Sequence, residues 1–186
     1  MGSENPTGAG NQQETEGTSR LELDPQWIVG FVDGEGCFSV AVHCNPYVRR
    51  TRGWQLQAAF QVYQHEDDRE VLDALTAFFG CGRVRSKGPN SRVLTFTVSS
   101  MQDLVARVIP FFEAHPLVVK AIDFAAFTDI VRSMQRKEHL SREGFERLAR
   151  LAYSMNKHGK QRARTIEEVL EGSPETARQV PPPRKL

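Results

Sequence analysis

Cysteine is scarce in this chain, and its three cysteines, at positions 37, 44 and 81, are an odd number without CxxC spacing. That pattern argues against a disulfide framework, and we expect reduced, half-buried thiols. No apolar run reaches the length that a membrane-spanning helix needs. The first residues lack the apolar core of a signal peptide and the arginine-rich character of a transit peptide. The sequence therefore predicts a protein of the cytoplasm or of an organellar matrix, with no membrane partner.

Acidic residues are missing from two separate segments, although the net charge of the whole chain is only +1. Residues 36–64 and 80–97 contain no Asp or Glu, whereas residues 131–164 carry ten Lys or Arg against three Glu. An ordinary solvated surface explains a single charge run, but it explains poorly why acids vanish from two segments. We therefore expect a basic surface of the kind that binds phosphate backbones.

The length of 186 residues and an apolar content of 39% suit one domain with its own core. Residues 1–22 are rich in Gly, Glu, Asn, Gln and Thr, and we expect a disordered N-terminal tail. Residues 172–186 contain three consecutive prolines, and we expect a second disordered tail there. The folded domain is thus predicted to span residues 23–171.

Hydrophobic periodicity and capping residues predict the order α-β-β-α-β-β-α with extra C-terminal helices. Asp24 is expected to cap the first helix, and Asn45-Pro46 to end the first strand. The fold class is thus α+β, with a four-stranded antiparallel sheet. The further elements are expected at 54–64 (strand), 67–79 (helix), 84–98 (hairpin), from Ser99 or Ser100 to near Pro110 (helix), 117–135 (helix), 141–155 (helix) and from Thr165 (short capping-box helix).

One face of the predicted sheet carries amides, cations and hydroxyls but no carboxylate. Arg and Lys suit guanine edges and Gln suits adenine, so this face is expected to read double-stranded DNA rather than to bind a small molecule. Arg83, Arg92 and the cluster at 49–52 could equally hold phosphates. The predicted base readers are Gln55, Gln57, Gln61, Arg85 and Lys87, and the other candidates on these strands are Ser39, Ala41, His43, Arg83, Arg92 and Thr95.

Two glycines of the first helix, Gly30 and Gly34, lie four residues apart on one helical face. Each costs about 1 kcal/mol relative to alanine, which close approach of a second backbone would offset. Glu35 follows at the helix C-terminus, where the macrodipole disfavours a negative charge. A symmetric partner helix would bring two Glu35 carboxylates together, and Mg²⁺ between them would make that arrangement tolerable. The pattern predicts a dimer with a metal-dependent phosphodiester-cleaving centre.

Residues 28–36, Ile-Val-Gly-Phe-Val-Asp-Gly-Glu-Gly, resemble the motif that names the LAGLIDADG homing endonucleases. The resemblance implies a homodimer, since the motif occurs once, and an intron-homing type of activity. It implies double-strand cuts across the minor groove of a long pseudo-palindromic site, with short 3′ overhangs. Glu35 and the Gly34 carbonyl would ligate Mg²⁺, for which Mn²⁺ could substitute. Val29 is bulkier than the usual alanine, and we expect it to loosen the helix contact slightly.

Later segments extend the resemblance over about residues 24 to 170. By that match Gln64 orders water at the scissile phosphate, and Lys120 is the active-site lysine, with His115 as the alternative. Asp33 is structural by the same resemblance, and Asp68 stands where some relatives carry a basic residue. The match also implies a C-terminal loop that contacts the DNA backbone through Asn156, Lys157, Lys160 and Arg162.

Two alternatives remain at this point. Proteins of this fold also act as RNA-splicing maturases or as DNA-binding proteins that no longer cut. A purely structural dimer, whose basic face binds nothing specific, is the other possibility. The retained Glu35 and Gln64 favour an active nuclease.

Overall fold

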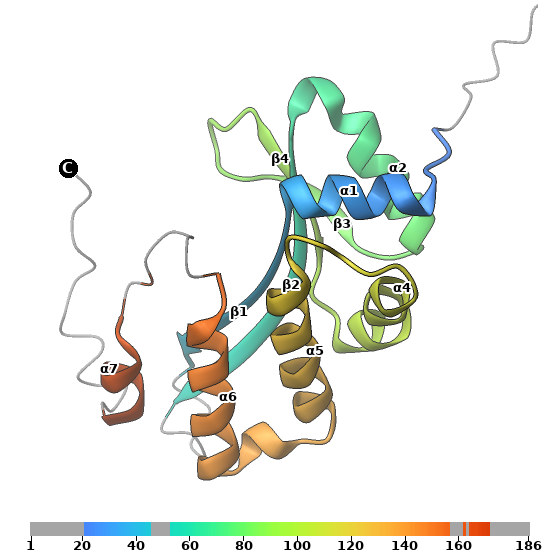
Figure 1. Cartoon of the computed structure of the whole chain (residues 1–186). Coiled ribbons are helices and arrows are strands. Elements are labelled where there is room, and N and C mark those ends of the chain that lie inside the picture. The colour runs from blue at the N-terminus through green and yellow to red at the C-terminus, as the bar shows by residue number, and fades with distance from the viewer. Residues whose placement is uncertain (1–20, 46–52, 157–161, 163, 172–186) are drawn as a thin grey trace, which may run out of the picture.

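A four-stranded sheet with helices packed against one face forms the body of the molecule in this computed structural model (Figure 1). The structure describes residues 21–45, 53–156, 162 and 164–171. The elements are α1 Pro25–Glu35, β1 Gly36–Cys44, β2 Trp54–His65, the short 3₁₀ turn η1 Glu66–Asp68, α2 Arg69–Phe79, β3 Arg83–Ser86, β4 Val93–Val98, α3 Met101–Asp103, the π-helical turn η2 Leu104–Val108, α4 Ile109–Ala114, α5 Ala121–Gln135, the 3₁₀ turn η3 Glu138–Leu140, α6 Arg142–Ser154 and α7 Ile166–Glu171.

The sheet is antiparallel throughout, in the order β1-β2-β4-β3. In the register, Gly36 pairs with Val62 and Phe60 pairs with Val98. Residues alternate along β1 and β2 between a buried face and a more exposed one. The observed order and the antiparallel sheet confirm the predicted α+β fold class.

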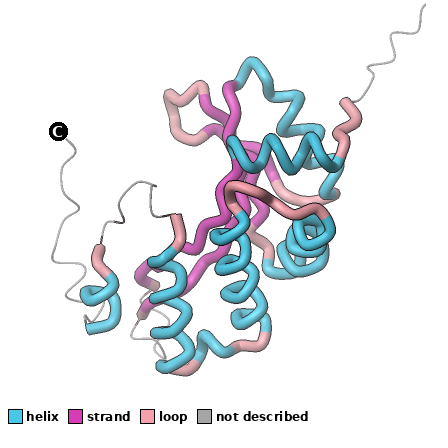
Figure 2. Tube along the Cα trace, viewed as in Figure 1, coloured by secondary structure: helices cyan, strands magenta, loops and turns pink. Residues whose placement is uncertain are grey.

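A cluster of phenylalanines holds the helices against the buried face of the sheet. The Phe38 ring lies 5.1 Å from Phe60 and 5.3 Å from Phe127 of α5, measured between ring centroids. Phe112 of α4 and Phe79 of α2 lie 5.5 and 5.9 Å from Phe60. Such aromatic pairs add to the free energy gained by burial. The helices thus cover one face of the sheet and leave the other face open. Figure 2 shows the magenta strands running past the cyan helices.

Several helix boundaries follow the predicted capping residues. The Asp24 carboxylate accepts hydrogen bonds from the backbone N–H groups of Gln26 and Trp27, and Ser141 caps α6 in the same way. Thr165 and Glu168 form the predicted capping box, with reciprocal bonds of 2.9 and 3.2 Å. The three predicted helix starts are therefore confirmed. They could be predicted because a cap depends only on contacts within one turn.

Two predicted boundaries are wrong. The helix that starts after Ser100 does not close at Pro110. It passes through the π-helical turn η2 and continues as α4 to Ala114, because the wider turn accommodates a residue without an N–H. The next helix, α5, starts at Ala121 rather than near Leu117, because the N–H groups of residues 118–120 bond to a side chain of α1 instead.

Some predictions fall outside the described residues: most of the two tails, and the arginine cluster at 49–52. Within the described part of the chain, no helix is both long enough and apolar enough to cross a membrane.

Candidate functional site

The C-terminal end of α1 delivers an exposed carboxylate to the start of the sheet. Gly36 is buried and donates its N–H to the carbonyl of Val32, so the helix passes into β1 without a loop. A Cβ atom at Gly36 would lie 2.6 Å from both the side chain and the carbonyl oxygen of Val32, which explains why glycine is needed. Glu35 and Gly34, just before this junction, are both exposed. The junction fixes their position relative to the strands.

Lys120 reaches the same place from a distant part of the chain. Its ammonium donates hydrogen bonds to the carbonyl oxygens of Asp33 and Gly34, the second at 3.3 Å. The lysine directly precedes α5, whose first turn begins with the bond from Phe124 N–H to the Lys120 carbonyl, 2.8 Å long. The Lys120 ammonium and the Gly34 carbonyl, two site groups that the sequence predicted separately, are therefore neighbours.

Asp33 ties these two segments together. Its carboxylate accepts hydrogen bonds from the backbone N–H groups of Val118, Val119 and Lys120, at 2.8, 3.2 and 3.0 Å. Desolvation by partial burial opposes ionisation. The three backbone hydrogen bonds and the charge of Lys120 nevertheless hold the pKa of Asp33 below its ordinary value. Asp33 therefore holds the segment 118–120 against the end of α1, a contact that the sequence pattern did not reveal.

His115 and Lys120 lie at opposite ends of α1. The His115 Nδ1 atom lies 3.5 Å from the side-chain nitrogen of Gln26, in the first turn of the helix, and the ring packs on Phe111. The nine residue-to-residue steps from Gln26 to Glu35 correspond to about 13 Å along a helix axis. The geometry therefore brings Lys120, and not His115, to the end of α1 that carries Glu35.

Gln64 lies at the same end of the sheet as Glu35. Gly36 pairs with Val62 in the antiparallel register. Glu35 directly precedes Gly36, and Gln64 lies two residues after Val62, so both extend past the same end of this strand pair. The Gln64 side-chain oxygen accepts the N–H of His65 at 2.8 Å. This bond orients the amide and leaves its NH₂ group as the free donor.

The open face of the sheet has the predicted polar character, and none of the four strands contains Asp or Glu. Ser39 and Tyr63 both donate hydrogen bonds to the side-chain oxygen of Gln61, at 3.4 and 3.2 Å. The Lys87 ammonium lies 4.7 Å from the centre of the Tyr63 ring. Burial raises the pKa of the neighbouring Cys37 thiol. The strands of this face therefore present cations and oriented amides and carry no carboxylate of their own.

The other predicted residues of this face are distributed along it by the register. His43 pairs with Gln55, whose side chain accepts a hydrogen bond from Asn45 at 2.9 Å. Ala41 pairs with Gln57, and both are exposed. On the far strand Arg85 is exposed and pairs with Thr95.

Two candidates on the sheet are less available than the sequence suggested. Thr95, which pairs with Tyr63 and Arg85, is only 7% exposed, so little of its surface is available for contact with DNA. Arg92 forms ion pairs with Glu66 at 2.6 Å and with Asp67 at 3.1 Å. Acidic residues outside the strands thus neutralise this arginine, and a segment-by-segment charge count could not reveal that.

The predicted C-terminal contacts also have partners within the chain. Asn156 donates to the carbonyl of Phe38 at 2.9 Å, and Arg162 donates to that of Val40 at 3.0 Å. Both carbonyls belong to β1, the edge strand, so these side chains protect an edge that could otherwise pair with another strand. Lys157 and Lys160 lie outside the described residues.

Internal ion pairs balance part of the basic character of residues 131–164. Arg132 binds Glu113 at 2.9 Å, and Arg147 binds both Asp129 and Glu138, at 3.3 and 2.8 Å. These pairs join α5, η3 and α6 and leave less free positive charge than the sequence count indicates.

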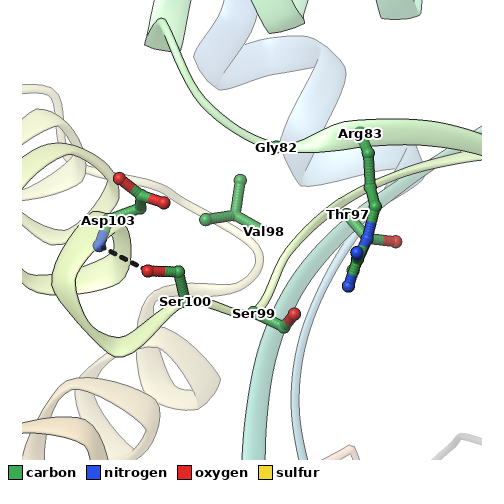
Figure 3. A pocket seen from close by; sticks show the side chains of 7 residues that line it. All are labelled: Gly82, Arg83, Thr97, Val98, Ser99, Ser100 and Asp103. Carbon is green, nitrogen blue, oxygen red and sulfur yellow. Dashed lines mark hydrogen bonds between the residues drawn. The ribbon is translucent and has the colours of Figure 1, made fainter.

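A pocket of about 210 Å³ lies at the far edge of the sheet, where β3 begins and β4 ends. Figure 3 shows Arg83 beside Thr97 on one side and Ser100 with Asp103 on the other. Ser100 caps α3 through the N–H of Asp103, at 3.4 Å. The Asp103 carboxylate lines the same space as Arg83, so the pocket does not select a negatively charged ligand.

One face of α1 is left uncovered by the residues that the structure describes. Cβ atoms added at Gly30 or Gly34 would have no neighbour within 4 Å. Trp27 and Phe31 stack on the same side, with ring centroids 4.7 Å apart, and Trp27 is 43% exposed. Val29 is only 8% exposed and packs in the chain's own core, away from this uncovered face.

The Glu35 carboxylate is an exposed acidic group at the C-terminal end of α1. Among the described residues, no three His, Cys, Asp or Glu side chains are grouped closely enough to hold a metal ion. The hard oxygens present, the Glu35 carboxylate and the Gly34 carbonyl, are the ligand type that Mg²⁺ prefers.

The chain as a whole is similar to proteins of known structure. The homing endonuclease I-TnaI, known from its crystal structure, is 39% identical, with a match that covers 81% of this chain and 98% of that one at a TM-score of 0.72. The archaeal intron-encoded homing endonuclease I-Vdi141I, solved in complex with DNA, is 30% identical over 79% of this chain and 92% of its own, also at 0.72.

A curated relative is the probable intron-encoded endonuclease 2 of Neurospora crassa, 34% identical over 135 residues. The match covers 72% of this chain but only 29% of the fungal protein, so the chain spans less than a third of that relative. Residues 28–131, more than half of the chain, match the family described as LAGLIDADG endonuclease. The chain therefore belongs to the LAGLIDADG endonuclease family, and its similarity to solved homing endonucleases extends beyond the motif to the whole αββαββα fold.

Proposed function

We propose that the chain is a site-specific homing endonuclease that cuts both strands of a long pseudo-palindromic DNA site as a homodimer. One observation carries the proposal: the end of α1 gathers the Glu35 carboxylate, the Gly34 carbonyl and the Lys120 ammonium at the start of a sheet face without acids. Relatives that are named as homing endonucleases, one of them solved with DNA, support the same function.

The oxygens at the end of α1 fit a magnesium ion, or manganese in its place. Glu35 is exposed and offers a carboxylate, and Gly34 offers a carbonyl oxygen beside it. The described residues of one chain hold no group of three His, Cys, Asp or Glu side chains for the ion, and a second copy packed on the Gly30/Gly34 face would add its own Glu35. The bound cation would activate water and balance charge on the phosphate.

Lys120 and Gln64 would act on the phosphate and its water. The Lys120 ammonium, held at the Gly34 carbonyl, would place a positive charge beside the scissile phosphate as negative charge develops. Gln64, with its oxygen already bonded to the His65 N–H, would use its free NH₂ group to orient a water molecule. Both side chains are oriented by bonds within the chain, which lowers the cost of organising the site.

The open sheet face would lie in the major groove and read the bases. Gln57 and Arg85 are exposed on β2 and β3, and each has the donors for bidentate contact with a base edge. Gln61 is already oriented by Ser39 and Tyr63. Two such faces related by a two-fold axis would read two half-sites, which accounts for a pseudo-palindromic target.

The test is a cleavage selection on a randomised duplex library, run with Mg²⁺ and with Ca²⁺ as the non-cleaving control. The proposal predicts recovery of one long site with two-fold symmetry that is cut only with Mg²⁺. Duplexes that are enriched but uncut with both ions would identify a DNA-binding protein without nuclease activity and would overturn the enzymatic part.

A further inference from the structure

Three apolar side chains at the start of α5 form an exposed edge that the chain's own core does not cover. Val118, Val119 and Ile122, called here the apolar edge, are 83%, 76% and 85% exposed. No other large apolar side chain among the described residues exceeds 46% exposure. Scattered exposed apolar residues are common, but three together at this exposure are typical of a contact surface.

The apolar edge is presented on a fixed frame. Leu117, just before it, is buried at 6% exposure, and the N–H groups of Val118 and Val119 bond to the Asp33 carboxylate. After it, α5 continues into the core through Phe127. The exposure therefore belongs to an ordered segment that is attached directly to the C-terminal half of α1.

We infer that the apolar edge is a second part of the homodimer interface, and that its partner is another copy of this chain. This inference rests on the proposed function. Asp33 joins the edge to α1 one residue before Gly34, whose open face is the expected contact between the two helices. A two-fold axis through the Gly30/Gly34 face would bring the two edges toward each other's chains, because Asp33 holds each edge beside that helix.

The apolar edge thereby links assembly to the completion of the site. The segment that exposes Val118 and Val119 to the partner also positions Lys120 at the Gly34 carbonyl. In a dimer this segment would be held on two sides. Asp33 of its own chain would bind its N–H groups, and the partner would pack against its exposed side chains. A monomer would keep the lysine but lack the outer support.

The test measures the dimer dissociation constant by sedimentation without DNA. The variant Ile122→Asp is compared with wild type and with Leu140→Asp, whose side chain is 37% exposed in η3, beyond the opposite end of α5. Each substitution occurs twice in a symmetric dimer, so Ile122→Asp should weaken dimerisation by at least about 100-fold. Leu140→Asp should leave the constant within about threefold of wild type.

Circular dichroism is used to check that each variant is folded. If Ile122→Asp is not folded, Val119→Ser provides a milder substitution. A wild-type constant for both folded edge variants would overturn the inference while leaving the homodimer in place. Loss of DNA affinity without loss of dimerisation would also overturn it, since the edge would then contact DNA. If wild type cuts its site as a monomer, the proposed homodimeric function itself is wrong.

Discussion

Replacing Asp33 by asparagine tests whether the bonds from α1 to the segment before α5 position Lys120. The substitution keeps the shape of the side chain and removes its charge. In the better of its two orientations, the asparagine oxygen still accepts from Val119 and Lys120, whose bonds to Oδ1 are 3.2 and 3.0 Å. The NH₂ group then faces the N–H of Val118, which donates to Oδ2 at 2.8 Å in the wild type. One charge-assisted hydrogen bond is lost and two donors face each other.

A hydrogen bond to a charged group contributes about 1.5–3 kcal/mol when well shielded. The bond from Val118 is exposed to solvent, so we expect a loss of about 1–2 kcal/mol in the free energy of unfolding. For a folded part of this size, that loss lowers Tm by roughly 3–6 °C. Cleavage should fall further, by about 10- to 100-fold, because a displaced Lys120 no longer meets the phosphate in the right place.

The matched control is Asp24→Ala at the other end of α1. It removes an N-cap that accepts two backbone N–H groups and should cost about 1 kcal/mol, with cleavage close to wild type at a temperature where both proteins are folded. Thermal unfolding and single-turnover cleavage on the selected site measure the two effects. If Asp33→Asn cuts as fast as Asp24→Ala, Asp33 does not position Lys120 and the reasoning fails.

Acid adds a check on the same carboxylate. The folded-state pKa of Asp33 is lowered, so its stabilising contribution is complete above the unfolded value of about 3.9 and is lost as pH falls through the folded value below it. The difference in unfolding free energy between wild type and Asp33→Asn should therefore be constant from pH 7 to about 5 and shrink below pH 4. A difference that persists undiminished at pH 2 would contradict the assignment.

Three further predictions concern single side chains. Glu35→Gln should abolish cleavage while leaving DNA affinity within a few-fold of wild type, as gel-shift and cleavage assays on one duplex would show; parallel loss of both would remove the catalytic role. Lys120→Met should slow single-turnover cleavage by at least about 100-fold, whereas His115→Ala should leave it nearly unchanged, since only the lysine lies at the Glu35 end of α1. Arg162→Ala should lower the unfolding free energy by about 1–2 kcal/mol and increase aggregation measured by light scattering, because the carbonyl of Val40 on the edge strand loses its donor; unchanged stability would show that the contact is dispensable.

Features that depend on neighbouring residues were predictable from the sequence. The alternation along β1 and β2 and the caps at Asp24, Ser141 and Thr165 all depend on contacts within a turn or on strand periodicity. The sheet face was predictable for the same reason, since a period of two assigns each residue to a side. These local signals were sufficient to predict the architecture and the position of Glu35.

Contacts between distant parts of the chain were not predictable. The bonds from Asp33 to residues 118–120 join positions at least 85 apart, and they explain why α5 starts late and why Lys120 rather than His115 reaches the site. Charge counts failed at Arg92 because its partners, Glu66 and Asp67, belong to another segment. The donors of Asn156 and Arg162, expected to contact DNA, bind an edge strand whose position depends on the whole sheet.

The most direct test of the central claim is a heterodimer of one wild-type and one Glu35→Gln chain. The two chains carry different affinity tags, and the purified heterodimer is incubated with a plasmid that contains the selected site. If the carboxylates of both chains complete one cutting centre, linear product should be lost and at most a single nick should remain. Linearisation at half the wild-type rate would contradict the account, because each chain would then cut both strands without its partner's carboxylate.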